Sequence, residues 1–396
     1  RGLGDVYKRQ TGAIRVMVGG REFRPGEREL NMALSPRQTG SSIKYFILAA
    51  AIQAGAQAGD QIDGRRGCAL PSGDPSKPIF QINGGVAGFV GNLRDITARS
   101  VNCGFARLSQ IVGLNRVVDM TYRMAESPYL YRGQPESERE PIQPFASYAT
   151  GANEMTPLDM AAGIQTLAND GVHQEPYYVE FIDDAEGNRL HTHFDAGTPV
   201  LDRDVALETI DIMTGTISNG TGRQRAPLAD ARPAVGKTGT QANHTNAWFV
   251  GGTKQLATAV WVGDPDAYTE MVYPSEIARE FGRVQGGGYP ALIWKTYMDD
   301  AHFGLPMVEF DQPAPPERAN ARLVLPGNEC EVTVVGTTGG EPIVPEEPEA
   351  PPVAVEQFQA EPTPPPAPEE PAPVETTPIV VITAKSDLGT TIAPDN

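Results

Sequence analysis

The chain has 396 residues, 40% of them hydrophobic and 7% aromatic, which is enough apolar material to bury a core in one large domain or two smaller ones. Its formal net charge of -18 disfavours nucleic-acid binding, because DNA and RNA select basic surfaces. Much of this charge is local, since residues 331–396 contain 12 acidic residues and one lysine, and the remainder is only mildly acidic.

The N-terminal end reads as the interior of a longer protein. Residues 1–10 show no helical or strand pattern, and we interpret them as a cloning or sequencing scar. Residues 11–20 then alternate like a strand that closes in a Gly-Gly turn. The sequence has no signal peptide, lipidation motif or apolar run of transmembrane length. A cytoplasmic protein and a fragment whose anchor lies upstream would both show this, and the abrupt start favours the fragment.

Residues 11–310 are predicted to form one mixed α/β domain. An almost wholly apolar run predicts a buried helix at residues 45–54, with Thr39, Gly40 and Ser41 as its cap residues. Further helices are expected at residues 96–112, 157–169 and 290–298. Strands are expected at residues 247–250 and 256–262, beside a strand that carries residues 237–240.

Residues 311–396 form an acidic tail rich in proline and glutamate. Such a composition buries too little apolar surface to offset its chain entropy, so the tail is predicted to be disordered and extended. Two short runs, residues 330–335 and 379–382, have the composition of isolated strands.

Three short motifs carry the chemistry of the domain. They stand in order as Ser41-Ser42-Ile43-Lys44, Ser100-Val101-Asn102 and Lys237-Thr238-Gly239-Thr240. Any one of them alone is a weak signal, because each also fits a turn, a strand end or a surface lysine. The ordered set indicates a serine nucleophile with a lysine base.

The spacing in the first motif suits proton transfer. Ser41 stands three residues before Lys44 at a helix start, which places both side chains on one face. The lysine can then take the hydroxyl proton, provided that burial and nearby cations lower its pKa. The helix N-terminus also offers free N–H groups to a developing oxyanion.

The other two motifs supply groups for a leaving amine and a carboxylate. The Ser100 hydroxyl can relay a proton, and the Asn102 amide can hold a peptide group of the substrate. Lys237 offers a cation, Thr238 and Thr240 offer hydroxyls, and Gly239 lets a ligand approach the backbone closely.

The cysteines leave two alternatives open. Cys103 directly follows Asn102, and Cys68 lies in the segment leading towards it, whereas Cys330 is in the tail. Cys68 and Cys103 are either two free thiols or a disulfide that requires an oxidising compartment. The pair His191 and His193 has no third ligand near it in sequence and fits a solvated hairpin.

The three motifs resemble those of the penicillin-binding, serine-lysine acyl-transferase superfamily. Six segments together resemble the transpeptidase domain of class A (bifunctional) penicillin-binding proteins; they are residues 37–44, 98–105, 155–160, 220–222, 235–240 and 246–251. The resemblance covers about residues 11–310. It implies an antiparallel five-stranded sheet flanked by helices, a mostly helical lobe, and a site between them.

The resemblance also implies roles. Ser41 would attack the D-Ala-D-Ala bond of a peptidoglycan stem peptide, with Lys44 as base, and an amine of a second stem peptide would resolve the acyl-enzyme. Ser100 would relay the proton, Asn102 would hold the donor, and the Lys237, Thr238 and Thr240 groups would bind the terminal carboxylate. The backbone N–H groups of Ser41 and Thr240 would form the oxyanion hole.

Several further expectations follow from the resemblance. β-Lactams would acylate Ser41, no metal or organic cofactor is implied, and the enzyme would work at the extracytoplasmic face of the bacterial membrane. An upstream glycosyltransferase domain, a membrane anchor and wall-synthesis protein partners are expected. The alternatives are a D,D-carboxypeptidase or β-lactamase of the same fold, or a non-catalytic β-lactam sensor or scaffold. Against a lactamase, the middle residue of the second motif is Val101 and not aspartate.

Overall fold

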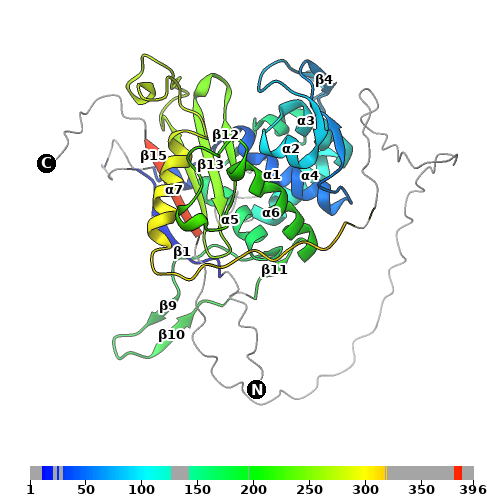
Figure 1. Ribbon diagram of the computed structural model, residues 1–396. Helices are drawn as coiled ribbons and strands as arrows, with labels where there is room; N and C mark the ends of the chain where they lie inside the picture. Colours follow the sequence, from blue (N-terminus) through cyan, green and yellow to red (C-terminus); the bar gives the residue numbers. More distant parts are fainter. Residues whose placement is uncertain are drawn as a thin grey trace.

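A computed structural model describes residues 11–20, 25, 30–125, 142–194, 196–316 and 318, and the backbone of residues 379–385. The expected scar at residues 1–10 and the expected strand at residues 330–335 lie outside the described residues. A central sheet with helices on both faces is joined to a lobe that is mostly helical (Figure 1). The predicted fold class, mixed α and β, is confirmed.

The sheet has the strand order β1-β15-β14-β13-β12. Its strands are β1 (Ile14–Val18), β12 (Val235–Thr240), β13 (Asn246–Gly252), β14 (Ala257–Gly263) and β15 (Ile379–Lys385). The last three strands of this order pair antiparallel, as expected. β15 pairs parallel with both β1 and β14, so the sheet is mixed and not wholly antiparallel. The tail run expected as an isolated strand is therefore an internal strand, because a β-branched run shows strand propensity but not its partner.

Alternate residues of the sheet face two different cores. On β13, Trp248 and Val250 belong to the core shared with α5 (Pro157–Ala168), while Ala247 and Phe249 belong to the core shared with α7 (Tyr289–Ala301). This is the period of two that a strand covered on both faces requires. The Phe249 and Trp294 rings lie 4.9 Å apart and join β13 to α7.

The predicted helices are present, with one interruption. The expected helix at residues 45–54 is α1 (Lys44–Gln53), and it is buried along almost its whole length. Its start is a 3-10 turn, η2 (Gly40–Ile43), and the Thr39 side chain makes no cap hydrogen bond, so the expected cap is wrong. The helix predicted at residues 157–169 is α5, which begins with a capping box between Thr156 and Asp159 and has proline in its first turn.

The expected helix at residues 96–112 is two helices. α2 (Leu93–Ala98) and α3 (Asn102–Val112) are separated by three residues. At the break, Ser100 has a φ of 57°, a left-handed conformation that is uncommon for residues other than glycine. The apolar period continues through the break, which is why sequence periodicity did not reveal it.

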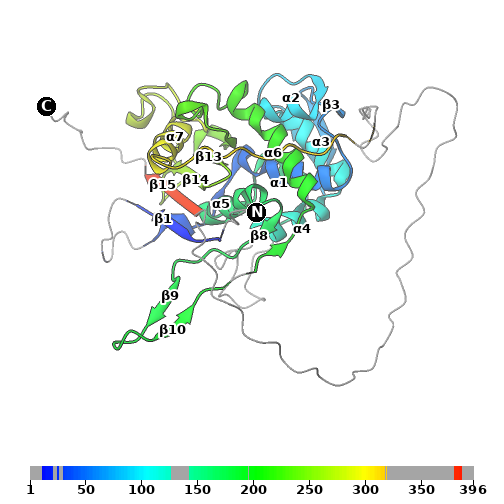
Figure 2. The same cartoon turned by 60° about the horizontal axis from the view of Figure 1, so that its bottom comes forward.

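The helical lobe also contains α4 (Leu114–Ala125) and α6 (Arg203–Ser218). Short strand pairs complete the fold; they are β2 (Arg37–Gln38) with β7 (Glu154–Met155), β3 (Gln61–Asp63) with β6 (Val90–Asn92), β4 (Cys68–Pro71) with β5 (Ile79–Ile82), β8 (Val172–His173) with β11 (Thr198–Pro199), and β9 (Phe181–Asp183) with β10 (Arg189–Thr192). The β9–β10 hairpin extends away from the body in both views (Figures 1 and 2). Among the described residues, no helix combines the length and apolarity needed to cross a membrane.

The chain stays in contact with the domain beyond residue 310. Arg203 pairs with Asp311, and the Arg318 guanidinium lies 2.7 Å from the Asp60 carboxylate. Phe310 is itself buried. The described part of the segment after residue 310 is thus held to the domain by ion pairs.

Candidate active site

The turn η2 carries Ser41 to the end of strand β12. Gly40 has a φ of 54°, and a Cβ atom there would meet the Thr240 backbone at 2.8 Å. On the strand side, a Cβ atom on Gly239 would lie 2.4 Å from the Thr39 carbonyl oxygen. The two glycines allow the turn and the strand to pack in close contact. The sequence suggested that Gly239 lets a ligand approach the backbone, but in the structure its missing side chain makes room for the turn.

Lys44 is fully buried behind the nucleophile. Its Nζ atom donates to the Asn102 Oδ1 atom at 2.6 Å and to the Ser100 carbonyl oxygen at 2.9 Å. Burial, followed by the positive charge of Lys237, holds the pKa of Lys44 well below its ordinary value of 10.5. The lowered pKa favours the neutral amine, which is the form that can accept a proton.

Lys237 approaches the same place from the sheet. Its Nζ atom donates to the Ser100 Oγ atom at 2.7 Å and to the Thr238 carbonyl oxygen at 3.0 Å. Burial lowers its pKa to about 7. Ser100 thus lies between two lysines, because its Oγ atom is also 3.5 Å from the Lys44 Nζ atom. A hydroxyl that accepts from Lys237 keeps its own proton free to donate.

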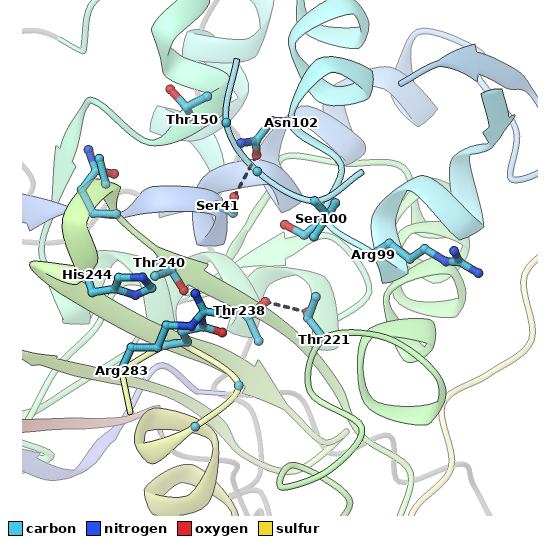
Figure 3. Close-up of a pocket in the computed structure, with 18 of the residues that line it drawn as sticks. Ser41, Arg99, Ser100, Asn102, Thr150, Thr221, Thr238, Thr240, His244 and Arg283 are labelled. Atoms are coloured by element: carbon cyan, nitrogen blue, oxygen red, sulfur yellow. Dashed lines mark hydrogen bonds between the residues drawn. The ribbon is translucent and has the colours of Figure 1, made fainter. Parts of the chain in front are cut away.

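The three motifs converge on one cleft of about 1100 Å³ (Figure 3). The Ser41 Oγ atom donates to the Asn102 Oδ1 atom at 3.4 Å, and this oxygen also receives Lys44. On the opposite wall, Thr238 and Thr240 line the cleft. Every residue expected at the site from sequence therefore lies in or directly beneath this cleft, apart from Gly239, which belongs to the packing of strand and turn.

Some groups at the cleft were not expected from sequence. The Thr221 and Thr238 hydroxyls are hydrogen-bonded at 2.6 Å, and the Gly286 N–H donates to the Thr240 Oγ1 atom at 3.1 Å. Four arginines also line the cleft: Arg99, Arg223, Arg225 and Arg283. Arg99 lies within a segment that resembles the family and Arg223 adjoins another, and Arg225 and Arg283 do neither, but no motif assigned any of the four to the site.

A disulfide bond restrains the chain next to the second motif. Cys68 on β4 and Cys103 on α3 are bonded, with Cα atoms 5.9 Å apart, so the free-thiol alternative is wrong. The bond joins residues 35 positions apart and ends beside Asn102, so it restrains the start of α3.

We expect the double variant Cys68→Ala/Cys103→Ala to lose about 3–4 kcal/mol of unfolding free energy, since the closed loop restricts the unfolded chain. Urea titrations of the variant and the oxidised parent measure this loss, and the reduced parent should match the variant. Equal midpoints for all three samples would contradict the prediction.

A serine one turn before a buried lysine, with a second serine between that lysine and a strand lysine, defines the serine-lysine acyl-transferase class. Comparison with known proteins agrees. Residues 5–281 match the family described as the penicillin-binding protein transpeptidase domain. The chain therefore belongs to the family of penicillin-binding protein transpeptidase domains, and the resemblance inferred from the motifs is confirmed.

Individual relatives carry the same description. The chain is 30% identical to penicillin-binding protein 1A of Aquifex aeolicus over 84% of its own length and 43% of that protein. It is 31% identical to penicillin-binding protein 1A of Mycolicibacterium smegmatis over 77% of its length and 38% of that protein. The chain thus spans less than half of these curated relatives.

The fold also matches a solved structure. The structure of PonA1 from Mycobacterium tuberculosis in complex with penicillin V aligns with a TM-score of 0.59 and 26% identity, covering 72% of this chain and 75% of that one.

Proposed function

We propose that this domain is a peptidoglycan D,D-transpeptidase that cross-links stem peptides through an acyl-enzyme on Ser41. The observation that carries the proposal is the position of Ser100, hydrogen-bonded to Lys237 and adjacent to Lys44, in the cleft that contains Ser41. These groups supply a nucleophile, a base, a proton relay and a cation within one site.

In the first half-reaction, the Ser41 Oγ atom bonds to the carbonyl carbon of the D-Ala-D-Ala peptide bond. Neutral Lys44 takes the hydroxyl proton, and the N–H groups of Ser41 and Thr240 stabilise the oxyanion. The carbon–nitrogen bond then breaks. Ser100 gives its proton to the leaving D-alanine and recovers one from Lys44. Asn102 holds the donor peptide.

In the second half-reaction, an amine of a second stem peptide attacks the ester. A new amide bond forms, and Ser41 leaves with a proton. Earlier, in the first half-reaction and before D-alanine leaves, the Thr238 and Thr240 hydroxyls bind its terminal carboxylate over the positive charge of Lys237. Neither half-reaction needs a metal or an organic cofactor.

Slow hydrolysis of the acyl-enzyme is the point that separates a transpeptidase from a β-lactamase. A lactamase needs a base that activates water, and no Asp or Glu side chain lines the cleft formed by the described residues. β-Lactams, which present a reactive amide and a carboxylate, therefore acylate Ser41 and stay bound. The solved relative PonA1 was determined with penicillin V bound.

The location follows from the same reasoning. Peptidoglycan cross-linking takes place at the extracytoplasmic face of the bacterial membrane, and the disulfide between Cys68 and Cys103 suits an oxidising compartment. An upstream glycosyltransferase domain, a membrane anchor and wall-synthesis partners belong to this proposal, since the relatives are more than twice as long as the matched region.

A fluorescent penicillin tests the proposal. The parent should form one adduct per chain that persists for many minutes, and Ser41→Ala should form none while keeping its melting temperature. Rapid release of the label would instead identify a lactamase.

Peptide products separate the remaining alternatives. A donor pentapeptide and an amine acceptor should give a cross-linked product. Hydrolysed tetrapeptide alone would identify a carboxypeptidase. A stable penicillin adduct without any peptide product would identify a sensor.

A further inference from the structure

Basic side chains line the active-site cleft formed by the described residues, and acidic side chains do not. In the whole chain, acidic residues outnumber lysines and arginines by 50 to 32. The described cleft nevertheless includes four arginines and one histidine, and no Asp or Glu. Such a lining focuses positive potential on the cleft and favours anionic ligands.

Two of these arginines, Arg225 and Arg283, are linked through the segment that contains Phe281. The Arg225 guanidinium lies over the Phe281 ring, 4.3 Å from its centroid, and Arg283 follows Phe281 by two residues on the same loop. Phe281 in turn packs against Tyr289 in an edge-to-face arrangement, with the two ring centroids 4.4 Å apart. Figure 3 shows Arg283 beside His244 and Thr240.

These two guanidinium groups have no anionic partner among the described residues. The Arg225 guanidinium makes one hydrogen bond, 3.3 Å to the neighbouring Gln224 side chain, and Arg283 is exposed. Stacking on a ring restricts a guanidinium and leaves its N–H edges free, and that arrangement suits bidentate binding of a carboxylate.

The terminal carboxylate of the donor already has a place at Thr238 and Thr240 in the proposed function. The additional charge on this wall therefore fits a second carboxylate on the substrate. We propose that Arg225 and Arg283 form an anion subsite for a side-chain carboxylate on the cross-linking residue of a stem peptide. The domain then prefers stem peptides with a free carboxylate at this residue over those in which it is an amide or absent. This inference rests on the proposed function.

The test compares paired probes that differ in one charge. Two donor pentapeptides carry the carboxylate or the matching carboxamide at the third residue, and the rate of D-alanine release is measured for each below saturation. Two amine acceptors with the same difference show whether the subsite serves the acceptor instead. The parent, Arg225→Gln, Arg283→Gln and the double variant are compared. Arg279→Gln is the matched control, because Arg279 is exposed on the same loop, pairs with Glu276 and does not line the cleft.

The parent should favour the carboxylate of one pair by roughly tenfold, in line with one charge-assisted bidentate contact. The ratio should fall towards one in the double variant, stay at the parent value in Arg279→Gln, and shrink with added salt. Because each ratio is taken within one variant, general loss of activity cancels. A parent ratio near one for both pairs, or a ratio unchanged in the double variant, overturns the subsite.

A second pair of probes keeps the two proposals apart. Acylation rates are measured for a penicillin and for its derivative with an additional side-chain carboxylate. If the peptides do not react, but the ratio of the two penicillin acylation rates falls in the double variant, the transpeptidase proposal is overturned and the subsite is retained. If the peptides react without preference for the carboxylate, the subsite is overturned and the transpeptidase proposal is retained. If the peptides do not react and the ratio of penicillin rates is the same in the double variant, both proposals are overturned.

Discussion

Replacing Lys44 with alanine should lower the rate of acylation by a penicillin by roughly 10³-fold or more, since general-base catalysis supplies 10²–10⁴ and the amine also positions its neighbours. The Lys44 Nζ atom contacts the Asn102 amide oxygen, which the Ser41 hydroxyl shares, and the Ser100 carbonyl oxygen. Its loss removes the proton acceptor and releases both groups. The second-order acylation rate constant, measured with a fluorescent penicillin, checks this prediction.

Two controls separate the chemistry from folding. Lys77→Ala removes an exposed lysine outside the cleft and should leave the rate at the parent value. The melting temperature of Lys44→Ala should stay within a few degrees of the parent, because burial of the Lys44 amine costs desolvation free energy and the substitution removes this cost. Acylation by Lys44→Ala at more than a tenth of the parent rate would rule out Lys44 as the base.

Lys237 should set the alkaline side of the pH profile. Its pKa is lowered to about 7 by burial, so it carries its proton below that pH and loses it above. Protonated Lys237 attracts a ligand carboxylate, and therefore acylation by a carboxylate-bearing penicillin should fall as pH rises from 6 to 8.5. The corresponding methyl ester should show no such fall, because the neutral ester has no carboxylate charge that protonated Lys237 could attract.

Two substitutions test this assignment. Lys237→Ala should slow acylation roughly 10- to 100-fold, in line with one charge-assisted hydrogen bond, and leave the fold intact. Lys237→Arg keeps a cation at every accessible pH and should abolish the alkaline fall. A profile that is flat from pH 6 to 8.5 for the carboxylate probe would contradict the role of Lys237.

Parts of the segment after residue 310 contact the domain, although its composition predicted a disordered tail. The predicted change at residue 311 remains a prediction for most of the tail, which lies outside the described residues. The strand β15, however, pairs with β1 and β14 inside the sheet, and Arg318 pairs with Asp60. Composition reports the average tendency of a segment, and short apolar or charged exceptions within it can still find partners.

The sequence alone predicted the candidate site residues of this protein and most of its helices and strands. Ser41 and Lys44 were predicted from local spacing, because residues three apart at a helix start lie on one face, while Ser100, Asn102 and Lys237 were predicted from two further motifs that follow in order. The buried helix α1 and the strands β13 and β14 were identified because apolar runs and alternation report burial directly.

The tertiary structure decided what depends on contacts between distant segments. These are the break at Ser100, the disulfide between Cys68 and Cys103, the parallel pairing of β15 and the arginines of the cleft. The lowered pKa values of Lys44 and Lys237 belong to the same group, since the burial of both amines, and the charge of Lys237 beside Lys44, exist only once helix and strand meet. Local patterns fix which residues can react, whereas desolvation and proximity, which make them react, arise from packing.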